Sequence, residues 1–232
     1  MKNRSNNFFK LVASSKHFST VEEAAIRELI AHFHLEKWAK GSIPFDEIST
    51  LHNFYIITKG RAKVYQINEK TGNEYIIEIL HKGSLFDIIC LLDNKRHFVL
   101  TEALDELEVL VAPLSLVREW LFKHPEFNKT LIPYLGHKIR FFEESATDLA
   151  LLSTWARTLK LLSLHLDPNN NSNLKLINNL SHKDLAGIIG SARNVLNRHL
   201  QKLKKEHIVQ VERSQIHIND IEALLHLFRK DV

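Results

Sequence analysis

The chain has 232 residues, of which 44% are apolar and 25% are charged, a composition typical of a folded globular protein and not of a disordered one. That length is enough for one large domain or two smaller ones, each with its own core. No apolar run approaches the roughly 20 residues that cross a bilayer, and the N-terminal segment lacks the long apolar core of a signal peptide, so a cytoplasmic location is expected. The single cysteine, Cys90, excludes an internal disulfide and a multi-thiolate metal cluster.

The formal net charge of +4 is distributed unevenly along the chain. Residues 151–232 hold 12 Lys and Arg against 7 Asp and Glu, whereas residues 1–150 hold 19 against 20. Within the basic part, residues 178–205 carry 6 basic side chains against 1 acidic one. A lysine-rich helix face is often plain solvated surface, but on a helix that follows a tight turn this excess indicates a surface for phosphates.

In chain order, residues 20–38 are predicted to form an amphipathic helix that leads into a strand. From about residue 38 to 113 the pattern changes to short apolar or alternating runs separated by turn signals. Thr71–Gly72–Asn73 lies between two such runs and predicts a hairpin. Evenly spaced short strands favour a small β-sandwich or β-roll over a parallel sheet. The runs are FYIIT, RAKVYQI, NEYIIEIL and TEALDELEVLVA.

Helices are predicted next, over residues 114–128 and then over residues 131–153, the second beginning near Pro133. The longer helix carries a stripe of apolar residues at alternating spacings of four and three, as in the seam of a coiled coil. The stripe consists of Leu135, Ile139, Phe142, Ala146 and Leu149. It predicts a dimer interface, with packing of the helix on its own domain as the alternative.

After another predicted helix over residues 152–166 and an exposed turn at DPNNNSN, two short helices flank Gly190. Ser181 is a suitable N-cap for the first, which would run to Ile189, and the second would run from about Ser191 to Lys204. Gly190 would provide the left-handed turn between them. A hairpin over residues 208–218 and a final helix follow, so the sequence predicts a winged helix-turn-helix.

The order of these elements resembles that of the Crp–Fnr family of bacterial transcription regulators, over nearly the whole chain. Gly60, Gly72 and Gly83 match the turn glycines of that family, and LSHKDLAGIIGSARNVLNRHLQKLKKEHIV resembles its helix-turn-helix throughout. The resemblance implies an α+β fold with three parts. These are an N-terminal double-stranded β-roll sensor domain of the cyclic-nucleotide-binding type (residues 1–130), a long dimerisation helix (131–153) and a C-terminal winged helix-turn-helix DNA-binding domain (154–232).

The resemblance also implies roles for the polar residues of the second helix. Arg193 matches the leading arginine of the family, which can grip guanine O6 and N7. Asn194 stands where better-known members have a glutamate, and because an amide prefers adenine we expect an altered sequence preference. Arg198 matches a third base or phosphate contact. The remaining residues expected to bind DNA, mainly through phosphates, are His182, Lys183, Ser191 and Lys202.

The sensor half departs from the cyclic-AMP-binding members. Asp87 and Ile88 replace the glycine–glutamate pair that holds the ribose. The arginine–serine pair that holds the phosphate falls at about His97–Phe98 or at Phe98–Val99. Arg96 reaches the phosphate position only with a register shift, and Phe142 replaces a base-contacting hydroxyl on the dimerisation helix. The expected effector pocket, in which cyclic AMP is not expected to bind, consists of six residues, Asp87, Ile88, Arg96, His97, Phe98 and Phe142.

The residues also bear on other cofactors and on other classes of protein. One cysteine cannot hold the iron–sulfur cluster of the Fnr type, whereas haem remains an alternative because the chain has 14 histidines. A cupin-like metal enzyme would need clustered histidines, but His81 and His97 are isolated, so no catalytic residues are expected. A protein-interaction adaptor would leave the basic helix unexplained. The expected partners are near-palindromic double-stranded DNA, a second copy of the chain and RNA polymerase, with no membrane.

Overall fold

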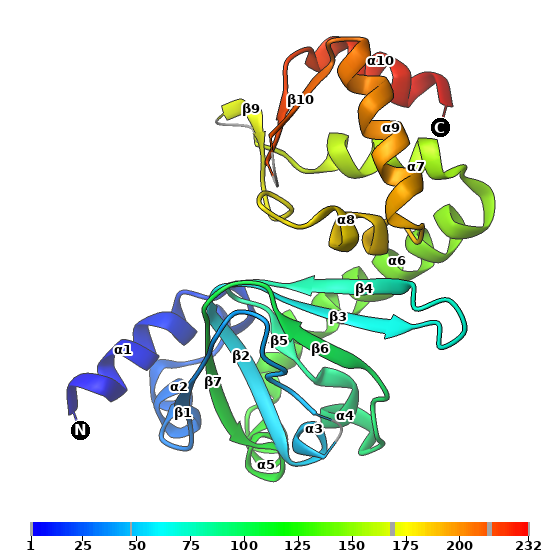
Figure 1. The fold of residues 1–232 in the computed structure, drawn as a ribbon. Coiled ribbons are helices and arrows are strands. Elements are labelled where there is room, and N and C mark those ends of the chain that lie inside the picture. Colours follow the sequence, from blue (N-terminus) through cyan, green and yellow to red (C-terminus); the bar gives the residue numbers. More distant parts are fainter. Residues whose placement is uncertain (1, 47, 168–169, 213–214, 232) are drawn as a thin grey trace. The chain divides into compact units, whose positions relative to one another are not determined.

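The structure, a computed structural model, describes residues 2–46, 48–167, 170–212 and 215–231 (Figure 1). It contains two compact units, one formed by Met1–Val64 with Ile79–Phe142 and the other by Tyr65–Glu78 with Glu143–Val232. Among the described residues, no helix is both long and apolar enough to cross a membrane.

The secondary structure alternates between strand-rich and helix-rich segments. The helices are α1 (Lys2–Ala13), η1 (Lys16–Phe18), α2 (Glu23–Ile30), α3 (Ser49–His52), α4 (Ile88–Asp93), α5 (Leu114–Lys123), η2 (Pro125–Phe127), α6 (Asn128–Leu151), α7 (Thr154–Leu164), α8 (His182–Ile188), α9 (Arg193–Lys205) and α10 (Ile221–Asp231). The strands are β1 (His34–Trp38), β2 (Asn53–Lys59), β3 (Ala62–Ile67), β4 (Glu74–Leu80), β5 (Leu85–Phe86), β6 (Leu100–Ala103), β7 (Leu107–Pro113), β8 (Leu166–Asp167), β9 (Asn170–Leu174), β10 (Val209–Glu212) and β11 (Gln215–Ile218).

Two sheets form the β-roll, one with strand order β1-β7-β2-β5 and one with order β4-β3-β6. The central strands β2 and β7 pair antiparallel, with Ile56 opposite Leu110, and both are buried along most of their length. Because side chains alternate between the faces of a strand, Phe54 and Ile56 pack with the helices, whereas the ring of Tyr55 lies 4.5 Å from that of Phe45. The predicted α+β fold with an N-terminal β-roll is confirmed.

Helix α6 begins earlier than the sequence predicted. The expected start near Pro133 is wrong, because the helix already begins at Asn128 and contains Pro133 in its interior. Proline costs one intrahelical hydrogen bond there. The turn before it is held by Leu131, which is 4% exposed in the core, and by the Thr130 hydroxyl, which donates to the carbonyls of His17 and Phe127. Burial and these side-chain bonds therefore outweigh the missing backbone bond.

The C-terminal elements form the predicted winged helix-turn-helix. Ser181 caps α8 by accepting a hydrogen bond from the Asp184 backbone N–H at 3.1 Å. Gly190 has φ +60° between α8 and α9, which is the left-handed conformation that the turn requires. Strands β10 and β11 pair antiparallel as the wing, and the tip of that hairpin, residues 213–214, lies outside the described residues.

Two local expectations are corrected. The stretch from Asp167 to Asn173 was expected to be an exposed turn, but Asn170–Leu174 forms strand β9, which pairs with β8, while residues 168–169 lie outside the described residues. Polar residues are poor strand formers alone, so pairing decides the conformation here. The run Ile88–Asp93 forms the short helix α4, which the sequence pattern did not predict.

Candidate nucleic-acid interface and effector region

Helix α9 separates an apolar face from a polar one. Leu196, Leu200 and Leu203 are at most 1% exposed and pack the helix onto its domain. Arg193, Asn194 and Arg198 are exposed, and in the described part of the chain none of the three takes part in a salt bridge or a side-chain hydrogen bond. Asn194 and Arg198 are one turn apart and share a face. The first turns of α9, drawn in orange in Figure 1, therefore present three uncommitted polar side chains to an external partner.

The other predicted DNA contacts already have partners within the chain. Nδ1 of His182 lies 2.7 Å from the side-chain oxygen of Asn197, and its Nε2 is buried without a hydrogen-bond partner. Nζ of Lys183 lies 2.6 Å from a carboxylate oxygen of Glu74. Ser191 is half-buried in the turn, where its backbone N–H donates to the carbonyl of Ala186 at 2.9 Å.

Lys202 belongs to a cluster that joins α9, α7 and α10. Its Nζ lies 4.2 Å from the centre of the Trp155 ring, a distance typical of a cation–π contact. The indole N–H of Trp155 donates to a carboxylate oxygen of Asp231 at 2.9 Å. His199 completes the cluster through a 3.0 Å hydrogen bond with the hydroxyl of Thr154. These contacts link α9 to α7 and α7 to α10, and they place the Lys202 ammonium beside the aromatic face of Trp155.

His199 was not singled out by the sequence, although it lies on the helix that carries the candidate DNA contacts. Burial, followed by the positive charges of Arg198 and Lys202, lowers the pKa of His199. A neutral imidazole suits its position, because a third positive charge there would be repelled by Arg198 and Lys202. The contact of His199 with Trp155 could not be predicted from the sequence, since the two residues are distant along the chain.

In the effector region, the carboxylate of Asp87 is enclosed by the chain itself. Asp87 is 1% exposed, and one carboxylate oxygen lies 3.0 Å from Nδ1 of His97. The Cys90 thiol donates to the other oxygen at 3.2 Å and also approaches the carbonyl of Lys95 at 3.0 Å. Burial, with the nearby negative charge of Asp87 as the second cause, raises the pKa of Cys90 to about 12. Cys90 is fully buried, and it remains a thiol at neutral pH.

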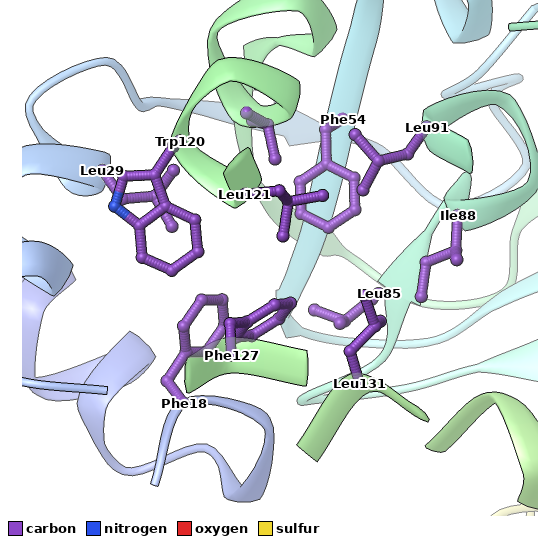
Figure 2. A pocket seen from close by; sticks show the side chains of 11 residues that line it. Phe18, Leu29, Phe54, Leu85, Ile88, Leu91, Trp120, Leu121, Phe127 and Leu131 are labelled. Carbon is purple, nitrogen blue, oxygen red and sulfur yellow. The ribbon is translucent and has the colours of Figure 1, made fainter. Parts of the chain in front are cut away.

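The residues of the expected effector pocket lie in different surroundings. Ile88 faces an apolar cavity of about 10 Å³ in the sensor core, together with side chains such as Leu91, Trp120 and Leu131 (Figure 2). Its walls are apolar and its size is that of a single water molecule, which makes it a packing void. By contrast, Phe98 is 62% exposed.

The helical geometry of α4 explains this separation. Residues three apart on a helix share a face, so Ile88 and Leu91 point into the core while Ile89 and Leu92 remain exposed. Arg96 is also exposed. Phe142, on α6, contacts Phe141 with ring centres 5.4 Å apart and is 38% exposed. Among the six residues of the expected effector pocket, Asp87 and His97 are joined by a hydrogen bond.

The stripe on α6 that was expected to form a dimer seam is mostly open. Ile139 is 67% exposed, and Phe142, Ala146 and Leu149 are also exposed. Leu135 differs, because it is half-buried against the core of the unit formed by Met1–Val64 with Ile79–Phe142. The middle of the helix therefore carries apolar side chains that are costly to leave in water.

The sequence matches two known domain families. Residues 35–124 match the cyclic nucleotide-binding domain, and residues 156–227 match the Crp-like helix-turn-helix domain, so together the matches cover more than half of the chain. A CRP-like cAMP-activated global transcriptional regulator of Mycobacterium tuberculosis is 22% identical over 93% of this chain and 97% of its own length. A global nitrogen regulator of Synechocystis is 25% identical over 75% of this chain and 79% of its own length.

Solved structures with the same fold include the following two. The global regulator CLP of Xanthomonas campestris aligns with a TM-score of 0.71 at 16% identity, covering 86% of this chain and all of the other. FixK2 of Bradyrhizobium japonicum aligns with a TM-score of 0.70 at 18% identity, covering 84% of this chain and 96% of the other. At such identities these likenesses show the fold alone.

Proposed function

Since the chain belongs to the Crp–Fnr family of transcription regulators, we propose that it is a cytoplasmic homodimer that binds a near-palindromic DNA site and modulates transcription together with RNA polymerase. The observation that carries this proposal is the polar face of α9, where Arg193, Asn194 and Arg198 are exposed and have no side-chain partner among the described residues, while the opposite face is packed. A helix held in this way can enter the major groove with its first turns against the base edges.

Each exposed side chain has a proposed contact. The guanidinium of Arg193 suits the paired acceptors O6 and N7 of guanine, and the amide of Asn194 suits the N6 and N7 edge of adenine. Arg198, one turn further on, contacts a third base or a phosphate. His182, Ser191, Lys183 and Lys202 would hold phosphates, which fix the register but carry no sequence information.

A regulator of this kind would dimerise through the exposed stripe on α6. Ile139, Phe142 and Ala146 offer an apolar surface in the middle of the helix, where a second copy of α6 would bury it. The spacing of four and three is that of a two-stranded coiled coil. Two copies related by a two-fold axis would then present α9 to half-sites about one helical turn apart, roughly 34 Å.

We further propose that cyclic AMP is not the effector. A cyclic phosphate near Asp87 would face a buried carboxylate that is already bonded to His97 and Cys90. Two adjacent anions repel, and among the described residues no arginine is bonded to the Asp87 carboxylate to neutralise them. The haem alternative gains no support from Cys90, because its raised pKa disfavours the thiolate that binds iron.

The proposed DNA binding is tested by selecting sites from a random duplex pool with the purified full chain. We expect enrichment of an inverted repeat with guanine and adenine in each half-site. Fluorescence anisotropy on the selected duplex should show binding that weakens linearly with the logarithm of the salt concentration. A pool that shows no enrichment, and no salt-dependent binding of any duplex, would contradict the proposal.

A further inference from the structure

The hairpin formed by β3 and β4 contacts the first helix of the helix-turn-helix through an ion pair. Nζ of Lys183, on α8, lies 2.6 Å from Oε1 of Glu74, on β4. The Glu74 side chain is only 6% exposed, whereas that of Lys183 is 59% exposed. Both residues belong to the same compact unit, formed by Tyr65–Glu78 with Glu143–Val232. The pair therefore joins a largely buried carboxylate to an ammonium that remains open to solvent.

Close packing beside the ion pair holds the strand against the helix. Ile76 is 3% exposed and lies over Gly187, where an added Cβ would come within 3.1 Å of Ile76 Cγ1 and 3.4 Å of the Glu74 carbonyl oxygen. At Gly190 an added Cβ would lie 3.6 Å from the ring of Tyr75. Three consecutive residues of β4 thus lie against α8 and the turn that follows it, at positions where the helix-turn-helix has glycine.

The chemistry of the ion pair sets up a competition. A carboxylate that is largely removed from water is costly unless a cation stays beside it. The ammonium of Lys183 is also the group expected to hold a DNA phosphate, and a point charge that moves toward a phosphate must weaken its contact with Glu74. The contact of Glu74 with Lys183 and the binding of DNA therefore compete for the same ammonium group.

We propose that the β3–β4 hairpin is an internal competitor of DNA, a latch made by Glu74 and Ile76 on β4 and by Lys183 and Gly187 on α8. The latch lowers the affinity for DNA while it is closed. It opens when a DNA phosphate binds the Lys183 ammonium and the contact of Lys183 with Glu74 breaks. Any event that moves the hairpin would thereby change the DNA affinity without touching α9. This inference rests on the proposed DNA binding.

The test compares two variants that remove one negative charge from the same hairpin. Glu74→Gln removes the partner of Lys183, whereas Glu69→Gln changes an exposed residue of the hairpin turn and serves as the control for net charge. On the selected duplex we expect Glu74→Gln to bind about two- to five-fold more tightly than Glu69→Gln, the range that one ion pair of this kind supports.

Repeating the comparison with Lys183→Ala isolates the pair. In that background Glu74→Gln and Glu69→Gln should bind equally, since the shared cation is gone. As a second measurement, amide hydrogen exchange of residues 74–78 should become faster when the selected duplex binds the wild-type protein.

The outcomes separate the two proposals. If wild-type protein binds its selected site but Glu74→Gln matches Glu69→Gln and the exchange of residues 74–78 is unchanged by DNA, the latch is wrong and the DNA-binding function stands. If wild-type protein binds no DNA at any salt concentration, the proposed function fails and the latch fails with it.

Discussion

Asp87 and His97 form a pair in which a carboxylate that is 1% exposed lies 3.0 Å from an imidazole nitrogen. The two residues are ten positions apart, at the start of α4 and shortly before β6, so the pair closes the loop between them. The Cys90 thiol donates to the second carboxylate oxygen. The effector region is thus organised around an anion that the chain itself supplies.

Removing the charge of Asp87 should destabilise the compact unit that contains it. Asp87→Asn keeps the size of the side chain but leaves His97 and Cys90 with a poorer acceptor, so we expect a loss of about 1–3 kcal/mol in the free energy of unfolding. Urea unfolding followed by tryptophan fluorescence measures it. Glu119→Gln, an exposed carboxylate on α5, is the control and should change stability by less than about 0.5 kcal/mol. Equal stability of the two variants would show that the Asp87 contacts contribute nothing.

Cyclic AMP should leave both stability and DNA affinity unchanged. A ligand present at 100 times its dissociation constant would stabilise the fold by about 2.7 kcal/mol, which is easily seen as a rise in Tm. The charge of Asp87 should prevent cyclic AMP from binding, and so from stabilising the fold, at physiological concentrations of the nucleotide. A clear thermal shift with cyclic AMP would overturn the interpretation of the effector region.

The pKa of Cys90 predicts a pH dependence of stability. In the unfolded chain the thiol ionises near its ordinary pKa of 9.0, whereas burial and Asp87 raise the pKa in the folded state to about 12. Between these values the unfolded state binds fewer protons, so this contribution is intact below pH 9 and is lost progressively as the pH rises toward 12. Urea unfolding at pH 7.5 and pH 10 should therefore show a larger decrease for wild-type protein than for Cys90→Ala. An equal decrease would mean that the folded thiol ionises normally.

The stripe on α6 predicts that a charge placed at its centre separates the dimer. Ile139→Glu would bring two carboxylates together at the two-fold axis, where burying an unpaired charge costs several kcal/mol. Sedimentation velocity should show the monomer. Phe122→Glu, which changes an apolar residue that is 83% exposed on α5, is the matched control and should remain dimeric. A dimer that survives Ile139→Glu would place the interface elsewhere.

Periodic patterns predicted the elements of this protein, and contacts between distant residues decided the details. The 3.6-residue period of Leu196, Leu200 and Leu203 was sufficient to orient α9, because one apolar stripe defines the buried face. The start of α6 was missed because a proline normally marks a first turn, and the burial of Leu131 that overrides it depends on tertiary packing.

In the candidate sites, too, local patterns predicted some features and contacts between distant residues decided others. Arg193, Asn194 and Arg198 could be placed from the motif, and the structure leaves them exposed. The bond between Lys183 and Glu74 could not be predicted, since the two residues are 109 positions apart and no local pattern connects them. The residues of the expected effector pocket differ in exposure for a local reason, because α4 turns Ile88 into the core while Phe98 is 62% exposed.

The most direct test of the central claim, that α9 reads bases, is site selection from a random duplex pool with wild-type protein, Arg193→Ala and Asn194→Glu in parallel. Arg193→Ala should relax the preference at one base pair in each half-site and cost about 1–3 kcal/mol on the wild-type site. Asn194→Glu should move the preference at its base pair from adenine toward cytosine, because a carboxylate accepts from the cytosine amino group. If all three proteins enrich the same motif, α9 does not read the bases and the account is contradicted.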